Sequence, residues 1–354
     1  IEPTAEYLAK MNLLISSLDV LKRHGFIVAE LTSEQLDKKK RCKTCNARGT
    51  HLFLNSKEKA PEVTAENKTA EGMQAEKEVV MRCKSHPGNF NQTMSCCGKP
   101  PGAPGCRQKK DHDPPEGQSE ALKTRWQYHH TPTAPQATHR VAVALDCEMG
   151  MAIDQELEVI RVTVIDYFTG DKLVDSLVWP DIYIKNCNTR WSGVTKKDMN
   201  DARREGKCLL GVAAVREAVF EFVGPETIVV GHAVGGDLGC LRWIHHKIVD
   251  THILEAEKRK KEEEEKKARE EEKAAEQDVE KEAVEEKGEP QSRPGSLASK
   301  SKKEAKANGT SLKALTMKHL GRAIQTAGKM GHDSFEDSLA SRDLLRHWII
   351  NLAE

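Results

Sequence analysis

The sequence predicts an α/β protein with a mixed five-stranded sheet flanked by helices. Residues 141–145 form an apolar run without polar alternation, which is typical of a strand buried on both faces. Residues 157–167 and 172–179 are two further strand-like segments, and the Phe-Thr-Gly-Asp sequence between them is typical of a hairpin turn. Beyond this hairpin, segments with helical periodicity alternate with short apolar runs, an order that is typical of a layered α/β fold.

The remaining elements follow from the same periodicities. Residues 5–24 predict one N-terminal helix, and residues 198–222 predict another that ends at Gly224-Pro225. The segment TRWSGVT at residues 189–195 is expected to be a loop. The other expected elements, in chain order, are a strand at 227–230, a helix at 238–245, a strand at 247–250 and helices at 311–320 and 333–352.

Shifts in composition divide the chain into segments of different character. The run KRKKEEEEKKAREEEKAAEQ mixes charges densely and has no apolar face, so it predicts a solvated insertion that is partly disordered. A contact with protein or RNA through the Lys patches of this insertion is the alternative. The expected organisation is a helical segment at 1–40, a Cys/His-rich region at 41–115 with a solvated insertion at 56–80, a connector at 116–140, an α/β domain at 141–255 and 310–354, and a charged insertion at 256–309.

The charge balance and hydropathy limit how the chain can bind its partners. The chain has 55 Lys and Arg against 55 Asp and Glu, a formal net charge of +0. Binding to nucleic acid would therefore depend on a local patch and not on a global basic field. No apolar run approaches the roughly 20 residues of a membrane-spanning helix. We therefore expect no membrane partner.

Two carboxylates at the end of the first predicted strand suggest a metal site. Asp146 and Glu148 are two residues apart, so in a strand their side chains point to the same face. Like charges so close repel each other, and burial adds a desolvation cost. A divalent cation relieves both effects, and oxygen ligands are those that Mg²⁺ or Mn²⁺ prefers. The alternative is that this Asp-x-Glu sequence merely ends a strand at a polar loop.

Three more ionisable residues lie at comparable junctions between predicted elements. Asp237 begins the helix after the fourth strand, Asp337 lies near the start of the last helix, and His332 precedes that helix by a few residues. Each has an ordinary explanation by itself. A carboxylate near a helix start is favoured by the macrodipole, and a histidine is common in loops. Together with the Asp-x-Glu pair, they are candidates for one catalytic site.

Cysteine and histidine cluster separately, between residues 42 and 112. Six of the ten cysteines lie there, in C-x2-C and C-x2-H spacings that fit zinc better than disulfides. Eight nitrogen and sulfur ligands suffice for two tetrahedral Zn²⁺ sites, with a structural role. The sequence does not say which ligands share a metal, and His51 could replace one of the two histidines. The eight candidates are Cys42, Cys45, Cys83, His86, Cys96, Cys97, Cys106 and His112.

Three segments of the α/β domain resemble the motifs of a known nuclease family. DCEMG, GHAVGGDLGCLRWIHHKIVDT and GHDSFEDSLA are similar to the three exonuclease motifs of the DEDDh branch of the DnaQ-like 3′→5′ exonucleases. VIRVTVID, TRWSGVT and SLKALTMKHLG resemble the Rex-type RNA exonucleases of eukaryotes, over residues 141–255 and 310–352. CKSHPG and SCCG also resemble a Cys/His-rich segment ahead of this domain in some fungal relatives. Gly236 and Ser338 depart from the usual pattern, but neither is a ligand position.

This resemblance implies an RNase H-like fold and an enzyme that hydrolyses RNA from its 3′ end and releases 5′-nucleotides. It implies two Mg²⁺ or Mn²⁺ ions, the one nearer the attacking water held by Asp146, Glu148 and Asp337. Asp146 would also reach the second ion, supported by Asp237, and His332 would act as general base.

The expected partner is RNA with a free 3′ end, in processing of non-coding RNA in the nucleus or cytoplasm, with protein partners at the zinc region or the insertion. The alternatives are a DNA 3′→5′ exonuclease and a non-catalytic, zinc-containing scaffold that binds RNA or protein.

Overall fold

The described part of the chain forms two compact units. A computed structural model describes residues 1–48, 82–88, 90–91, 93–100, 103–113, 119–134, 136–285, 309–326, 328 and 331–352; for residues 90–91 and 272–285 it describes the backbone alone. Unit 1 comprises Ile1–Val28 and His129–Glu354, and unit 2 comprises Ala29–Tyr128. The expected insertion at residues 56–80 lies outside the described residues.

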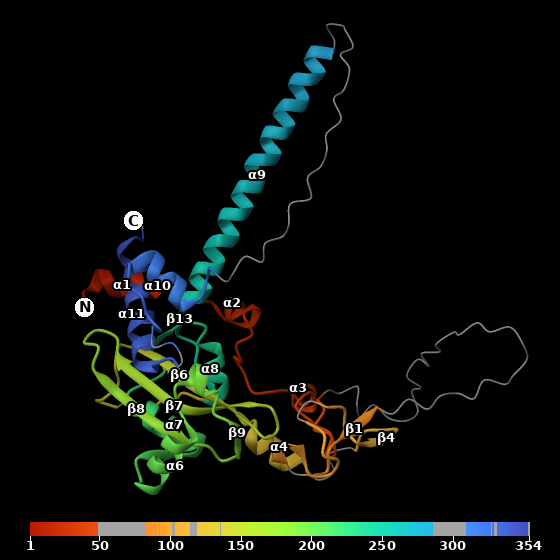
Figure 1. Ribbon diagram of the computed structural model, residues 1–354. Coiled ribbons are helices and arrows are strands. Elements are labelled where there is room, and N and C mark those ends of the chain that lie inside the picture. Colours follow the sequence, from red (N-terminus) through yellow and green to blue (C-terminus); the bar gives the residue numbers. More distant parts are fainter. Residues whose placement is uncertain are drawn as a thin grey trace, which may run out of the picture. The chain divides into compact units, whose positions relative to one another are not determined.

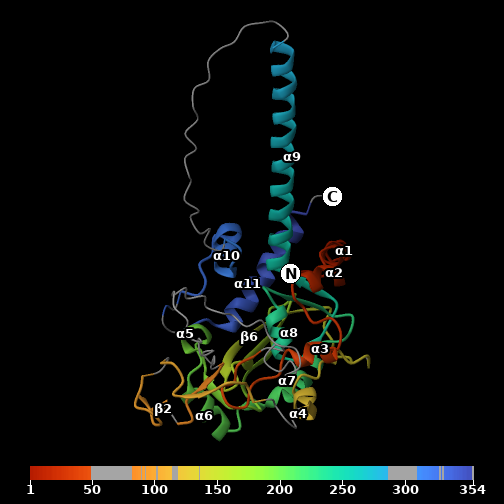
Figure 2. The ribbon, with the colours of Figure 1, turned by 90° about the vertical axis from the view of Figure 1, so that its right-hand side faces the viewer.

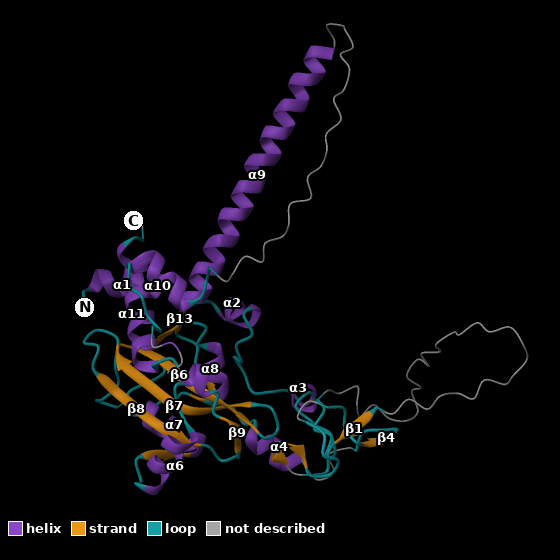
Figure 3. Ribbon diagram, viewed as in Figure 1, coloured by secondary structure: helices purple, strands orange, loops and turns teal. Residues whose placement is uncertain are grey.

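Unit 1 is built on a mixed seven-stranded sheet in the order β10-β8-β7-β6-β11-β13, with β9 paired to β6 (Figures 1 and 3). The three strands β6, β7 and β8 run antiparallel, as the hairpin spacing predicts, whereas β11 is parallel to both β6 and β13. The strands are β6 (Ala142–Ala152), β7 (Leu157–Asp166), β8 (Lys172–Trp179), β9 (Ile184–Asn186), β10 (Cys208–Leu210), β11 (Ile228–Gly231) and β13 (Ile248–Asp250).

The first half of β6 is buried on both faces, which explains its uninterrupted apolar sequence. Val143 and Leu145 pack in one core cluster with side chains of α7 (Gly211–Phe220) and α8 (Gly235–Cys240). Ala142 and Ala144 pack in a second cluster with α1 (Ala5–Leu13) and α11 (Ser334–Ile350). The expected α/β class with a mixed sheet and flanking helices is therefore confirmed.

The count of five strands is wrong, because the short strands β9 and β10 join the sheet. β10 also divides the helix expected at residues 198–222 into α6 (Lys196–Arg204) and α7. Gly206, with a φ of 67°, ends the first of these helices, since a left-handed backbone cannot continue it. The expected loop at residues 189–195 contains the short helix α5 (Thr189–Ser192).

Two other helices differ from expectation. The N-terminal helix expected at residues 5–24 is α1 followed by α2 (Leu18–Arg23), and Ser17 caps the second by accepting the Val20 N–H. The helix expected at residues 238–245 begins earlier, as α8, and gives way to β12 (Trp243–Ile244), which pairs with β5 (His129–His130).

The first part of the expected charged insertion, residues 256–285, lies in a long helix, α9 (Thr251–Glu285), which follows β13 in the chain; Figure 2 shows α9 as one continuous helix. Its first turn is buried at Thr251, Ile253 and Glu255, whereas residues 261–271 are exposed throughout. This exposure agrees with the absence of an apolar face in the sequence. Residues 286–308 lie outside the described residues. The next described helix is α10 (Leu312–Leu320), which packs on α11.

The described residues of unit 2 contain only short elements. Two antiparallel strand pairs are present, β1 (Cys83–Ser85) with β4 (Arg107–Lys109) and β2 (Phe90–Asn91) with β3 (Thr93–Met94). Its helices are α3 (Ser33–Asp37) and α4 (Ser119–Arg125). In the part of the chain described, the helices are too polar or too short to cross a membrane.

Candidate functional site

The paired acids of β6 lie on the sheet face that α11 covers. Asp146 and Glu148 continue the row of Ala142 and Ala144, whose face packs against α11. A bulge in the β6–β7 pairing lies directly after Glu148, a device that bends a strand and redirects its side chains. Glu148 is only 7 % exposed and stands opposite Arg161 of β7. Because side chains alternate along β6, both carboxylates point to the same face of the sheet.

Asp237 approaches the same part of β6 from the side of the neighbouring strand β11. It lies in the first turn of α8, directly after β11, which runs parallel to β6. Its Oδ1 accepts the backbone N–H of Cys147 at 2.9 Å, between the two acids of β6. Because Asp237 is 6 % exposed, this hydrogen bond fixes a buried carboxylate beside Asp146 and Glu148.

Asp337 and His332 come from the start of α11. The carboxylate of Asp337 is buried in the first turns of this helix, and its Oδ2 lies 3.7 Å from His332 Nδ1. Its Oδ1 is buried and has no hydrogen-bond partner among the described residues. The imidazole of His332 keeps 33 % of its side-chain surface exposed. A buried acceptor without a donor is costly, so Asp337 fits the binding of a cation.

Burial raises the pKa of all four carboxyl groups, and repulsion from nearby carboxylates adds to the rise. Desolvation comes first for Asp146, whose pKa is raised well above its usual value, with further increases from Asp237, Asp337 and Glu148. Burial, then Asp337, raises the pKa of Glu148 to about 7. Burial likewise raises the pKa of Asp237 well above its usual range and that of Asp337 to about 6. The arrangement therefore needs protons or a cation to neutralise it.

The acids do not form a compact ligand set as they stand. In the described ranges, the sets of ligand atoms within 4.8 Å of one another are two Cys/His groups, and the four acids are not among them. The donor types and the unpaired oxygen of Asp337 fit Mg²⁺ or Mn²⁺, which prefer oxygen ligands.

Three residues that sequence reasoning missed support the acids and the imidazole. Gln325 Nε2 donates to Asp337 Oδ2 at 3.0 Å. The backbone oxygen of Trp191 in α5 accepts the backbone N–H of His332 at 2.6 Å, and the two side-chain rings meet edge to face. The positive charge of Arg161 opposes the rise in the pKa of Asp146 and Glu148. Only Trp191 carried a sequence signal, as part of TRWSGVT.

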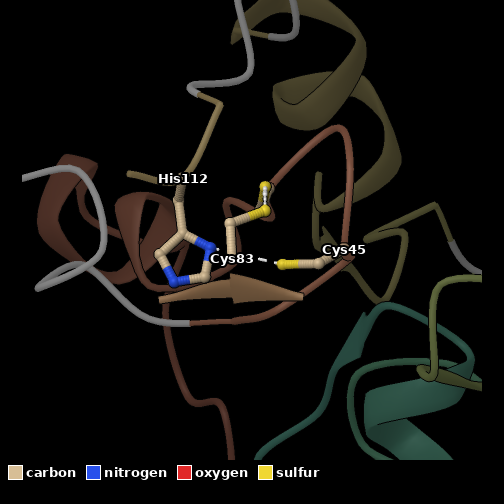
Figure 4. Close-up of side chains that lie close together, drawn as sticks. Cys45, Cys83 and His112 are labelled. Carbon is tan, nitrogen blue, oxygen red and sulfur yellow. Dashed lines mark hydrogen bonds between the residues drawn. The ribbon is translucent and has the colours of Figure 1, made fainter. Parts of the chain in front are cut away.

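The eight predicted zinc ligands of unit 2 assemble into two groups of four. The first comprises Cys42, Cys45, Cys83 and His112, whose ligand atoms all lie within 4.8 Å of one another. Figure 4 shows the labelled side chains of Cys45, Cys83 and His112 turned toward one another. Cys42 Sγ lies 3.8 Å from Cys83 Sγ, and Cys45 Sγ lies 3.2 Å from His112 Nδ1.

The second group comprises His86, Cys96, Cys97 and Cys106. His86 Nδ1 lies 3.6 Å from Cys96 Sγ and 3.4 Å from Cys97 Sγ, and Cys106 Sγ lies 3.5 Å from Cys96 Sγ. His86 Nε2 donates to the Ala103 carbonyl oxygen at 3.1 Å. This bond leaves Nδ1 unprotonated and directed at the thiols, as a metal ligand requires.

The spacing within both groups fits zinc. Ligand atoms about 2.0–2.3 Å from a tetrahedral Zn²⁺ are separated by roughly 3.3–3.8 Å. The sulfur and nitrogen separations above run from 3.2 to 3.8 Å and are within about 0.1 Å of this range. The structure thus resolves which of the eight residues share a site. His51, the alternative ligand, lies outside the described residues.

The chain is similar in sequence to several proteins named RNA exonuclease. The chain is 26 % identical to RNA exonuclease 3 of Emericella nidulans over 96 % of its own length and 51 % of the relative's. It is 27 % identical to RNA exonuclease 3 of Candida albicans, over 75 % of the chain and 54 % of the relative, and 36 % identical to human RNA exonuclease 1 homolog, over 47 % and 13 %. The chain is related to the Rex-type RNA exonucleases.

The chain spans about half the length of the fungal relatives. No family model matches it. Among solved structures, the Pan2 catalytic unit of Neurospora crassa, a protease and nuclease domain, is 16 % identical with a TM-score of 0.38, over 65 % of this chain and 32 % of that one.

Proposed function

We propose that the chain is a 3′→5′ exoribonuclease of the DEDDh type, which hydrolyses phosphodiester bonds at RNA 3′ ends and releases 5′-nucleotides. The observation that supports this most is the position of Asp146, Glu148, Asp237, Asp337 and His332. These residues are distant in sequence, and they lie at one edge of the sheet. The strand order, with β6 between antiparallel β7 and parallel β11, favours the RNase H-like fold that the resemblance implies.

Each group has a distinct role in the proposed reaction. Asp146, Glu148 and Asp337 would hold one divalent ion and Asp146 with Asp237 a second; such ions would supply positive charge for the phosphate and a lower pKa for the attacking water. His332 accepts the proton of the attacking water. Its Nδ1 faces Asp337 Oδ2, which leaves Nε2 for this proton. Desolvation lowers the pKa of His332, so the imidazole is neutral and able to act as a base near pH 7.

Gly331 provides a test of how precisely His332 must be placed. Its φ is 81°, and a Cβ there would overlap the backbone of Gly193. Gly331→Ala should therefore displace His332 and lower kcat by about a hundredfold, the cost of roughly 1 Å of misplacement. Gly321→Ala is the matched control, because Gly321 has a φ of 62° but no atom within 4 Å of its Cβ position. Equal kcat losses in the two variants would contradict this role for Gly331.

The raised pKa values predict how stability depends on pH without divalent ions. Glu148, with a pKa of about 7, and Asp337, at about 6, hold protons more tightly in the fold than in the unfolded chain. Their stabilising contribution is complete below about pH 4 and is lost as the pH rises through 6 to 7. Calorimetry of the unit 1 transition should therefore show a falling Tm over that range.

Mg²⁺ or Mn²⁺ should raise the lowered Tm at pH 8 by several °C. About 1 kcal/mol of stabilisation from ion binding corresponds to roughly 2–4 °C in a domain of this size. Glu148→Gln should weaken both the pH effect and the cation effect. An unchanged response to the cation in this variant would contradict a metal role for Glu148.

Product analysis is the direct test of the proposed function. Single-stranded RNA labelled at its 3′ end should release a labelled mononucleotide early in the reaction, with Mg²⁺ and not without it. A competing substrate with a 3′-terminal deoxyribonucleotide separates RNA from DNA preference. Intact RNA after long incubation with Mn²⁺ would favour the alternative of a non-catalytic, zinc-containing scaffold.

The remaining assignments rest on this proposal. The two Cys/His groups fit structural Zn²⁺, one ion each, and the predicted domain boundaries place them ahead of the exonuclease domain at residues 141–255 and 310–354. Processing of non-coding RNA in the nucleus or cytoplasm stays a prediction, as do protein partners at the zinc region or the charged insertion.

A further inference from the structure

Positive charge is concentrated in the part of unit 2 that carries the Cys/His groups. Between residues 82 and 113 the sequence has six Lys and Arg residues but only two acids, Asp111 and Asp113, although the whole chain has a net charge of +0. A local excess of cations in a neutral chain indicates a specific anionic partner, because it is not part of a general basic field.

The pairing of β1 with β4 places these charges on one face. Arg82 donates its N–H to the Lys110 carbonyl at 3.4 Å, and Lys84 pairs with Gln108. Alternation along both strands directs these four side chains to the same side, and all four residues are exposed. We call this set, Arg82, Lys84, Gln108 and Lys110, the cationic face.

The opposite face of the same strand pair has a structural role. Cys83, which is 1 % exposed, belongs to the first Cys/His group. Lys109 beside it is neutralised by Asp113, at 2.6 Å. On the cationic face, by contrast, Arg82, Lys84 and Lys110 form no ion pair with any carboxylate in the described ranges. Three exposed cations are therefore available to a ligand.

The two Cys/His groups hold both ends of the strand pair. Cys83 and His112 of the first group lie at the start of β1 and after the end of β4. His86 and Cys106 of the second group follow β1 and precede β4. A strand pair of only three residues per strand is not stable by itself. Ligand groups at both ends keep the cations at fixed spacing, which reduces the entropy cost of binding.

We propose that the cationic face of unit 2 binds the phosphate backbone of RNA, as a second contact besides the 3′ end. This inference rests on the RNA substrate proposed above. Cations at strand spacing, with an amide side chain beside them, are suited to phosphate and sugar oxygens and not to particular bases. We therefore expect the contact to increase affinity for long RNA without sequence preference.

The test measures binding and trimming separately, in the full chain. Asp146→Asn blocks trimming, and in that background Arg82→Gln, Lys84→Gln and Lys110→Gln are combined. Fluorescence anisotropy with a long uridine homopolymer should show at least about tenfold weaker binding. The slope of log K against log salt should become shallower by about 2, since each cation contributes roughly 0.7 on single strands.

A matched control has the same charge change elsewhere. Lys261→Gln, Lys267→Gln and Arg269→Gln lie on the exposed part of α9 and should leave both quantities unchanged. Equal losses of RNA affinity in the two triple variants would overturn the proposal. It would also be overturned if the chain without these substitutions bound poly-glutamate as tightly as it binds RNA. Zinc content must be the same in all variants.

With Asp146 restored, the triple variant of the cationic face should trim a tetranucleotide at the normal rate but have a raised KM on long RNA. A parallel loss on both substrates would overturn the proposal. Failure of the parent chain to trim either substrate would instead count against the exonuclease function.

Discussion

Replacing Asp146 with Asn should reduce Mg²⁺-dependent trimming of single-stranded RNA at least about a thousandfold. The substitution keeps the shape of the side chain but removes a charge at the centre of the acidic cluster. Asp237, Asp337 and Glu148 all raise the pKa of Asp146, which places its carboxylate within electrostatic reach of each of them. Loss of this one group should therefore weaken both proposed ion sites.

The control for Asp146→Asn is Asp171→Asn. Asp171 is an exposed acid at the turn between β7 and β8, so its substitution makes the same chemical change without touching the cluster. It should retain the full rate. Initial rates on labelled RNA, over a series of Mg²⁺ concentrations, measure both variants. Trimming by Asp146→Asn at more than a tenth of the normal rate in saturating Mg²⁺ would remove Asp146 from the proposed mechanism.

His332 gives an independent check on the same reaction. Since its pKa is lowered from the usual value, the imidazole should be neutral over the working range, and trimming should fall only when acid protonates it. His332→Ala should lower kcat by about 10²–10⁴ and abolish the part of the pH dependence that comes from the imidazole.

The fold of unit 1 could be predicted where periodicity is strong. The buried run of β6, the β7–β8 hairpin and the last helix all have patterns long enough to specify one structure. The errors occur where elements are short. β9 and β10 have three residues each, too few for a periodic signal, and their pairing depends on tertiary contacts.

The site shows the same division. Asp146, Glu148, Asp237, Asp337 and His332 were predicted because their residue types carry the chemistry and their segments resemble nuclease motifs. Gln325 and Arg161 were missed because they act through neighbours that only the fold brings close. In unit 2 the ligand types were evident from spacing, but the division into two groups of four was not, because chain distance does not determine which pairs converge.

Replacing Cys83 with Ser should cause the largest loss of structure. Cys83 lies in the first Cys/His group and in β1, and burial, then the thiols of Cys45 and Cys42, raises its pKa to about 12. The Cys42 pKa is lowered to about 6, with burial opposed by the backbone N–H groups of Cys45 and Thr44. Because the pKa of one thiol is lowered and that of its neighbour is raised, the thiols of this group cannot all ionise unless a cation compensates their charge. Zinc would provide that charge.

We expect Cys83→Ser to lose at least one of the two zinc ions per chain by elemental analysis and to unfold unit 2. Structural zinc contributes about 10–16 kcal/mol of binding free energy in small metal-dependent domains, which exceeds what so short a set of strands and helices can replace. Cys208→Ser is the control, since Cys208 of β10 belongs to neither group.

Limited proteolysis should cleave the variant within residues 29–128, while calorimetry should show the unit 1 transition unchanged. Two zinc ions retained in Cys83→Ser, or a joint loss of both units, would contradict a structural metal confined to unit 2. A chelator applied to the unsubstituted chain should remove zinc from both Cys/His groups and unfold unit 2, as Cys83→Ser does.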